Sequence, residues 1–265
     1  MSLFQLFVLA LVQGITEFLP ISSSGHLILV PEMTNWPDQG LAIDVAVHVG
    51  TLGAVMLYFR SDVARLANGG LQSLGRRGDG ADKQRFWQLV IATIPVVIAG
   101  LALKTAGLDD ALRDPLVIAA ASIGFGLILY VFDMRAPRLN VIQAMSYRHA
   151  VILGCAQVLA LIPGASRAGT TMTAARALGY KRPDAARFSM LMSIPTILAA
   201  GLLLGLDVVS GGTQLGSDAA IAAALSFVSA LAAIHFLMRW LEHASMTVFV
   251  FYRVALGGVL LWWFL

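Results

Sequence analysis

The stretch QGITEFLPISSSGH, residues 13–26, interrupts a long apolar segment near the N-terminus. Proline cannot donate a helical hydrogen bond and its ring clashes with the preceding turn. Pro20 and Gly25 should therefore divide residues 3–31 into two half-helices around a loop. A second interruption, PGASRAGTT at residues 163–171, lies inside the apolar segment 148–178. Each interrupted segment is predicted to form a hairpin of two short helices.

The composition of the chain is that of a membrane protein. Of its 265 residues, 58% are hydrophobic and 12% are charged, whereas soluble domains carry about 25% charged residues. The net charge of +3 does not indicate a nucleic-acid site, because the basic residues lie in short loops between apolar runs. The single cysteine, Cys155, excludes a disulfide framework, a thiolate zinc site and a CxxC redox pair.

The apolar stretches outside the two hairpins are long enough to cross a bilayer. A crossing takes about 20 residues, and suitable stretches lie near 42–60, 86–104, 115–133, 187–207, 218–240 and 246–265. The run Leu3 to Val12 has neither a basic residue before it nor a small-residue cleavage site after it, so we expect it to belong to the mature fold. The predicted fold is an all-α integral membrane domain with six transmembrane helices and two re-entrant hairpins.

The loop charges predict the orientation. Short cytoplasmic loops carry an excess of Lys and Arg, and the basic loops of this chain hold Arg60, Arg65, Arg76, Arg77, Lys83 and Arg85, then Arg135, Arg138 and Arg148, then Arg176, Lys181, Arg182 and Arg187. The segments that alternate with these loops along the chain contain more Asp and Glu than Lys and Arg. With six crossings, this pattern requires the first hairpin to enter from outside and the second from the cytoplasm. Both termini are then outside.

The two halves are predicted to be an inverted repeat within the single domain. Residues 1–133 and 148–265 form the repeats, joined by a cytoplasmic connector at 134–147. Gln13-x6-Pro20-x2-Ser23-x-Gly25 in the first resembles Gln157-x5-Pro163-x2-Ser166-x2-Gly169 in the second. Three crossings per half turn the second copy upside down, and such repeats place their site where the broken helices meet.

Glu17 and Arg167 are the Asp, Glu, Lys or Arg residues inside the two interrupting stretches, 13–26 and 163–171. A charge at the centre of an isolated membrane helix costs about 2.5 to 3.5 kcal/mol, so each should meet a partner, a ligand or water. A purely structural ion pair is one interpretation, with the serines satisfying helix ends. It leaves the triple serine, His26 and the Gly/Pro breaks without a common purpose, so we favour a binding site.

The pattern around these charges favours an anion site. The guanidinium of Arg167 matches phosphate oxygens, and the helix that opens between Gly164 and Gly169 offers free N–H groups. Gln13 and Glu17 lie one helical turn apart and can hold a divalent cation, Mg²⁺ or Ca²⁺, that bridges diphosphate oxygens. Ser23 can attack phosphorus with His26 as base, or His26 can attack it.

Two other features have a structural interpretation. His48 lies in a predicted crossing beside small residues, and we expect it to be a packed, hydrogen-bonded histidine rather than a ligand. The glycines of the crossings, Gly100 and Gly201 among them, are expected to mark close helix packing.

The motifs resemble those of the integral-membrane undecaprenyl-diphosphate phosphatases that confer bacitracin resistance. The E/Q-x3-E motif and the SS-x-GH loop of that family match Gln13, Glu17, Ser22, Ser23, Ser24, Gly25 and His26. Its PG-x-SR-S-G motif with a following threonine matches Pro163, Gly164, Ser166, Arg167, Gly169 and Thr171. Ala168 replaces the usual serine, which removes any catalytic hydroxyl at that position. The resemblance runs nearly end to end.

The resemblance implies hydrolysis of undecaprenyl diphosphate to the monophosphate and inorganic phosphate, which recycles the lipid carrier for cell-wall synthesis. It also implies a bacterial inner-membrane location, a divalent cation, access from the outer, periplasmic face and a homodimer. Catalytic roles fall to Glu17, Ser23, His26 and Arg167. Substrate contacts fall to a second group: Gln13, Ser22, Ser24, Gly164, Ser166, Gly169 and Thr171.

Two alternatives remain. Inverted repeats with broken helices also build transporters, so the same anion site could serve a polyprenyl-phosphate transporter or flippase. A second type of membrane lipid phosphatase uses a PSGH stretch and an SR-x5-H stretch with a nucleophilic histidine. The position that this second stretch requires for its histidine is occupied by Thr173.

Overall fold

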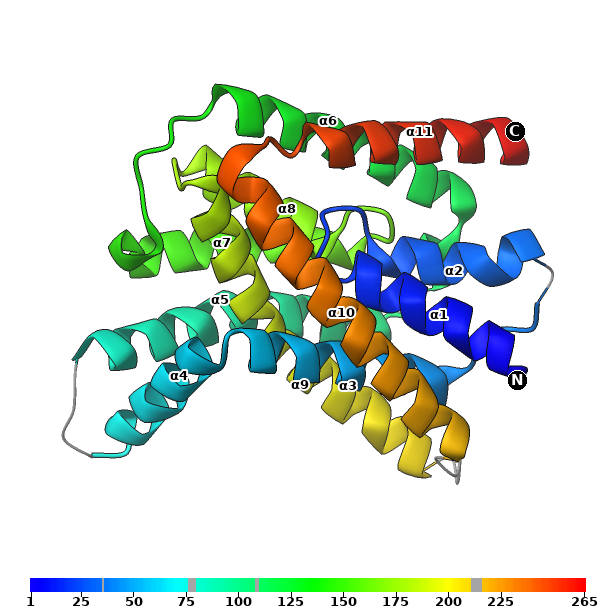
Figure 1. Cartoon of the computed structure of the whole chain (residues 1–265), viewed down its shortest axis with the longest axis horizontal. Coiled ribbons are helices and arrows are strands. Elements are labelled where there is room, and N and C mark those ends of the chain that lie inside the picture. The colour runs from blue at the N-terminus through cyan, green and yellow to red at the C-terminus, as the bar shows by residue number, and fades with distance from the viewer. Residues whose placement is uncertain (35, 76–79, 108–109, 211–215) are drawn as a thin grey trace.

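The chain folds into a bundle of helices (Figure 1). The computed structural model describes residues 1–34, 36–75, 80–107, 110–210 and 216–265. Within these ranges the extended structure is a single β-bridge between Asn140 and Tyr180. The all-α prediction is confirmed.

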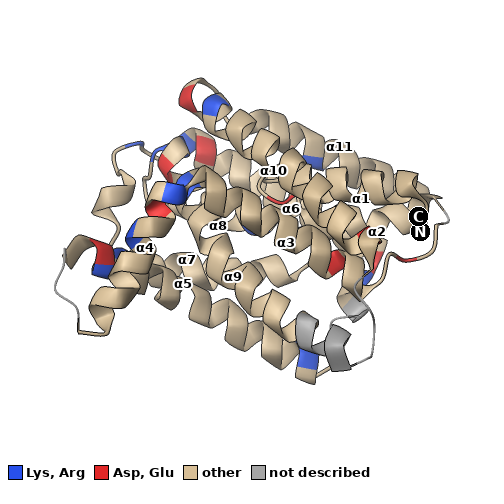
Figure 2. Ribbon diagram, turned by 60° about the horizontal axis from the view of Figure 1, so that its bottom comes forward, with Lys and Arg blue, Asp and Glu red and all other residues tan. Residues whose placement is uncertain are grey.

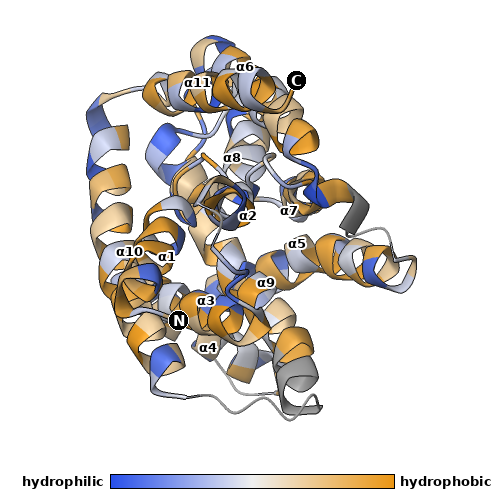
Figure 3. Ribbon diagram, turned by 90° about the vertical axis from the view of Figure 1, so that its right-hand side faces the viewer, coloured by the Kyte–Doolittle hydropathy of each residue, from blue (hydrophilic) through white to orange (hydrophobic). Residues whose placement is uncertain are grey.

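In the described part of the chain, six helices are long and apolar enough to cross a membrane. They are α3 (Leu41–Tyr58), α5 (Gly80–Thr105), α6 (Pro115–Arg135), α9 (Arg182–Ser210), α10 (Ser217–His243) and α11 (Thr247–Phe264). Large apolar side chains cover their outer faces: Leu202, Val228 and Phe251 are 66%, 64% and 72% exposed. Figure 3 shows this hydrophobic character along the helices. The six predicted crossings are confirmed, and the chain is a multi-pass membrane protein.

The interrupted segments form pairs of short helices, as the proline and glycine positions predicted. The first pair is α1 (Leu3–Thr16) and α2 (Ser23–Thr34), and the second is α7 (Tyr147–Val158), extended by the 3-10 turn η3 (Leu159–Leu161), with α8 (Arg167–Ala177). None of these four α-helices exceeds 14 residues, which is short of a bilayer crossing. Their re-entrant course stays a prediction.

Helices of one half cover the hairpin of the other. Helix α1 packs on α10, and α7 packs on α5. Gly14 and Gly154 permit these approaches, because an added Cβ would lie 1.9 Å from Ser229 Oγ at the first position and 2.6 Å from the Ala92 carbonyl at the second. The inverted repeat of residues 1–133 and 148–265 stays a prediction.

Most of the charged residues lie at one end of the bundle (Figure 2). Here α4 (Arg60–Ser73) follows α3, and the connector contains the 3-10 turn η2 (Ile142–Ala144). Buried Asp133 accepts from Arg176 at 3.3 Å and Arg182 at 2.7 Å, and Asp62 accepts from Arg187 at 2.7 Å. Both termini lie at the opposite end (Figure 1), near η1 (Asp110–Arg113). The side of the membrane on which each end lies stays a prediction.

Candidate active site

The two interrupted loops touch in the interior of the bundle. The Gly164 N–H donates to Ser22 Oγ at 3.1 Å. Ser22 and Ser166 have φ angles of +76° and +70°, and they are the non-glycine residues with positive φ in the described part of the chain. Such backbone is costly for a residue with a side chain and is concentrated at functional sites.

The two loops share a local geometry. Ser166 Oγ accepts from the Gly169 N–H at 3.0 Å, and Ser22 Oγ accepts from the Gly25 N–H at 3.4 Å. Each serine therefore caps the start of the helix that follows its loop. The sequence pattern paired Ser23 with Ser166, whereas the backbone pairs Ser22 with Ser166. When the two loops are aligned in this way, Ser23 and Arg167 are equivalent positions, because Ser23 begins α2 and Arg167 begins α8.

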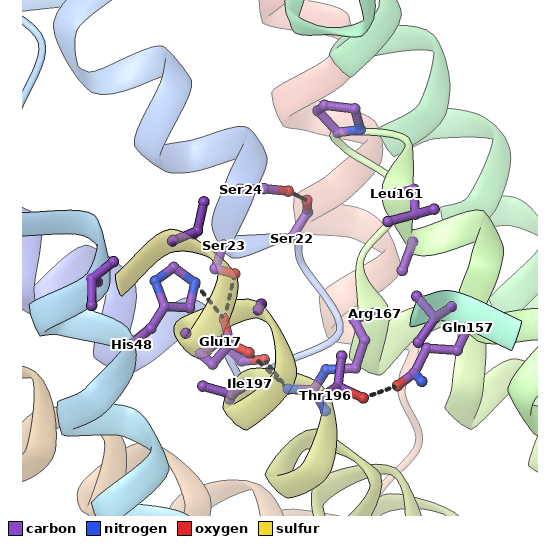
Figure 4. Close-up of a pocket in the computed structure, with 17 residues that line it drawn as sticks. Glu17, Ser22, Ser23, Ser24, His48, Gln157, Leu161, Arg167, Thr196 and Ile197 are labelled. Carbon is purple, nitrogen blue, oxygen red and sulfur yellow. Dashed lines mark hydrogen bonds and ion pairs between the residues drawn. The ribbon is translucent and has the colours of Figure 1, made fainter. Parts of the chain in front are cut away.

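The carboxylate of Glu17 is the centre of the site (Figure 4). Its Oε2 accepts from Ser23 Oγ at 2.6 Å and from Gln13 Nε2 at 3.0 Å. Its Oε1 accepts from Arg167 Nη2 at 2.8 Å. Glu17 is 8% exposed, so this ion pair and its hydrogen bonds offset the cost of burying the charge. The predicted meeting of the first loop with Arg167 is present.

A second set of contacts orients the Arg167 guanidinium. Its Nη1 donates to the Ser189 carbonyl at 3.0 Å, and it lies over the Phe18 ring at 5.8 Å. Thr171 Oγ1 donates to the Arg167 carbonyl at 2.7 Å and lies 2.7 Å from Ser189 Oγ. Thr171 was predicted to contact substrate. Its hydrogen bonds stabilise the helical turn that carries Arg167, and its contact with substrate stays a prediction.

A cavity of about 370 Å³ adjoins this cluster. Its polar part is formed by Glu17, Ser22, Ser23, Ser24, His48, Gln157, Arg167 and Thr196 (Figure 4). The remaining lining is mainly apolar, with residues from α3, α5, η3 and α9: Val45, Val96, Ala160, Leu161, Pro163, Ile197, Ala200, Gly201 and Leu204. A polar cluster at the edge of an apolar space suits a lipid with a charged head.

His26 does not line this cavity. Its Nδ1 lies 2.6 Å from the Ser22 carbonyl, its Nε2 lies 2.5 Å from the Tyr252 hydroxyl, and its ring stacks on Tyr252. Both ring nitrogens are thus engaged on the side of α2 that faces α11. The catalytic role of His26 stays a prediction.

His48 faces the cavity from α3, which the sequence reasoning missed. Its Nδ1 lies 2.7 Å from the Asp44 carbonyl, and because a carbonyl only accepts, Nδ1 carries a proton. Its Nε2 lies 4.0 Å from Glu17 Oε2, and the side chain is 35% exposed.

Arg253 is a second residue that the sequence reasoning missed. It is fully buried on α11 and donates to the carbonyls of Gly164 at 2.8 Å, Ala165 at 3.0 Å and Pro20 at 3.3 Å. One guanidinium therefore holds both loops together. An arginine inside a predicted crossing is costly, and that cost was a signal for a structural or functional role.

The glycine positions of the second loop are tightly enclosed. Gly164 has a φ of +90°, and an added Cβ would lie 2.5 Å from the Ile118 carbonyl. At Gly169 an added Cβ would lie 2.7 Å from Arg253 Nη1. These glycines allow the loop to pack against α6 and Arg253. Direct contact of Gly164, Gly169 and Ser166 with substrate stays a prediction.

The divalent cation predicted at Glu17 and Gln13 stays a prediction. Gln13 is fully buried and does not line the cavity, and among the described residues its Oε1 has no hydrogen-bond partner. A carboxylate and a free amide oxygen are hard ligands, and Mg²⁺ commonly combines few protein ligands with substrate phosphates. Among the residues that the structure describes, no group of three His, Cys, Asp or Glu side chains could hold a metal. Substrate and water would have to complete the shell.

Comparison with known proteins assigns the family. The family model described as bacitracin resistance protein BacA matches residues 6–259. The chain belongs to the BacA family. BacA relatives named undecaprenyl-diphosphatase include those of Ruegeria pomeroyi, 55% identical, and Roseobacter denitrificans, 52% identical, each over 98% of both chains. A relative of that name from Erythrobacter litoralis is 47% identical over 100% of both chains.

Proposed function

We propose that this BacA-family chain is an undecaprenyl-diphosphatase, a hydrolase that converts undecaprenyl diphosphate into undecaprenyl phosphate and inorganic phosphate. The name of its relatives supports the reaction. The observation that carries the proposal is the contact of Ser23 Oγ with Glu17 Oε2 at 2.6 Å, beside Arg167 and at the polar edge of an apolar cavity. In the cell this activity recycles the lipid carrier for peptidoglycan synthesis and gives bacitracin resistance.

The geometry favours Ser23 as the nucleophile. Its hydroxyl proton points to Glu17, which accepts it as Ser23 Oγ bonds to the terminal phosphorus. The bond between that phosphorus and the bridging oxygen breaks, and undecaprenyl phosphate leaves. Water then attacks the phosphoserine, Ser23 recovers its proton, and inorganic phosphate leaves.

Arg167 and its neighbours stabilise the charge that this transfer spreads over the phosphoryl oxygens. Positioning and electrostatic stabilisation dominate phosphoryl transfer. Ser22, Ser24 and Gln157 line the same space and supply further polar groups. A divalent cation, when held by Glu17 and Gln13 Oε1, would neutralise the diphosphate.

The site is proposed to open to the outer face of the bacterial inner membrane. The support is the gathering of Lys and Arg at the opposite end of the bundle (Figure 2), which the positive-inside rule assigns to the cytoplasm. Both termini are then periplasmic. The homodimer implied by the resemblance stays a prediction.

The histidine-nucleophile mechanism of the other lipid phosphatases is not favoured. Thr173, at the position that its motif requires, donates to the Gly169 carbonyl at 2.6 Å inside α8, and it does not line the cavity. No specific contact favours a transporter over a hydrolase.

The test is phosphate release from undecaprenyl diphosphate by the purified protein, with chelator and with added Mg²⁺ or Ca²⁺. We expect metal-dependent release that Glu17→Gln reduces by about a thousand-fold, because the carboxylate accepts the serine proton. The matched control is Glu242→Gln, on an exposed part of α10. Binding of the lipid without any phosphate release would instead support the transporter.

A further inference from the structure

A narrow apolar space continues from the active-site cavity toward the lipid. It has a volume of about 130 Å³, and four of its lining residues also line the active-site cavity: Val96, Leu161, Thr196 and Ala200. The other residues come from α5 and α9: Val97, Gly100, Leu101, Ala199 and Leu203. The two spaces therefore adjoin between these two membrane-spanning helices.

The outer end of this space reaches the lipid-facing surface. Val97, Leu101 and Leu203 are 36%, 49% and 39% exposed. Thr196 is the polar side chain in its lining, and its hydroxyl donates to the Met192 carbonyl at 2.9 Å. An apolar chain could follow this route without leaving a polar group unpaired, which matters because an unpaired polar group is costly in an apolar environment.

Two glycines leave room where the two spaces adjoin: Gly100 lines the narrow space and Gly201 lines the active-site cavity. Among the atoms that the structure describes, an added Cβ at Gly201 would meet none within 4 Å, and at Gly100 it would lie 3.6 Å from Leu161 Cδ2. The expectation that these glycines mark close helix packing is therefore wrong for Gly201, which has room beside it. The contrast is Gly50 on α3, where an added Cβ would lie 2.2 Å from the Ala223 carbonyl.

We propose that the polyprenyl tail of the substrate leaves the active site between α5 and α9, through a tail channel lined by Val96, Gly100, Leu161 and Ala200. This inference rests on the proposed function and adds the path of the tail. Gly100 becomes a specificity-determining residue, because any larger side chain there occupies space that the isoprene units need.

A second apolar groove competes for the tail. It lies among α1, α10 and α11, has a volume of about 550 Å³ and is lined by residues such as Ile15, Ala232, Phe236 and Tyr252. This groove is larger, but it shares no lining residue with the active-site cavity. Continuity with the Glu17 cluster therefore favours the tail channel.

The experiment compares phosphate release from undecaprenyl diphosphate and from dimethylallyl diphosphate, which has one isoprene unit. Gly100→Leu should lower kcat/KM for the long substrate by about ten-fold or more, mainly through KM, and should change the short substrate less than about three-fold, since filling a hydrophobic pocket discriminates by such factors. The matched control, Ala232→Leu in the competing groove, should change neither value. An effect of Ala232→Leu on the long substrate alone, equal losses with both substrates in Gly100→Leu, or no effect of Gly100→Leu would overturn the proposal.

A second measurement does not depend on turnover. Benzoylphenylalanine in place of Leu203 should form a photo-crosslink with bound undecaprenyl diphosphate, and the same group in place of Phe236 should not. Capture from position 236 alone, or from neither position, would overturn the tail channel. If wild-type protein releases no phosphate from either substrate, the proposed function fails, while this crosslink still decides the path of the lipid.

Discussion

Replacing Arg167 by lysine tests the phosphate clamp. The guanidinium donates to Glu17 Oε1 at 2.8 Å, to the Glu17 carbonyl at 3.5 Å and to the Ser189 carbonyl at 3.0 Å. We propose that its other N–H groups bind the phosphoryl oxygens. Lysine keeps the charge but brings a single nitrogen. If that nitrogen stays with Glu17, the bidentate contact with phosphate is lost.

The expected loss follows from the value of a charged hydrogen bond. One such bond contributes about 1.5 to 3 kcal/mol, so Arg167→Lys should lower kcat/KM by about 10- to 150-fold. Steady-state phosphate release from undecaprenyl diphosphate measures this. Arg239→Lys is the matched control, because Arg239 is 72% exposed on α10, and it should leave the kinetics unchanged. Unchanged kinetics in Arg167→Lys, with the protein folded, would refute the clamp.

Three further changes test other parts of the structure. Arg253→Met should lower the free energy of unfolding by a few kcal/mol, because buried carbonyls of both loops lose their donor; an unchanged thermal transition in detergent would contradict this. His48→Ala should lower kcat about ten-fold if His48 helps to orient Glu17, while His48→Gln, whose amide can still hydrogen-bond, should retain most activity; equal losses would argue against a positioning role. Gly14→Leu should prevent folding, since even a Cβ would lie 1.9 Å from Ser229 Oγ, whereas Gly258→Leu on open α11 surface should fold; size-exclusion chromatography separates the two outcomes.

The membrane-spanning helices, the two interrupted segments and the contact between Glu17 and Arg167 were predictable from the sequence. Six apolar stretches had to be helices, because a lipid-exposed backbone must satisfy its own hydrogen bonds. Pro20 and Pro163 had to interrupt theirs. The meeting of Glu17 with Arg167 followed from the cost of two charges in apolar segments.

The features that depend on helix rotation were not predictable. Ser23 and His26 are three residues apart, yet one contacts Glu17 and the other contacts Tyr252 on α11. No periodicity in α2 distinguishes the side that faces the cavity from the side that faces α11. His48 was missed for the same reason, since the cavity lies beside only one face of α3. Arg253 was predictable, because a charged residue inside the apolar stretch 246–265 must find buried partners.

The most direct test of the central claim is phosphate release by Ser23→Ala beside wild-type protein, His26→Ala and the distant control Ser61→Ala. The account predicts that Ser23→Ala loses turnover by about a thousand-fold or more, as for removal of a nucleophile. It also predicts that His26→Ala keeps measurable turnover and that Ser61→Ala equals wild type. Full turnover in Ser23→Ala, with loss confined to His26→Ala, would contradict the account.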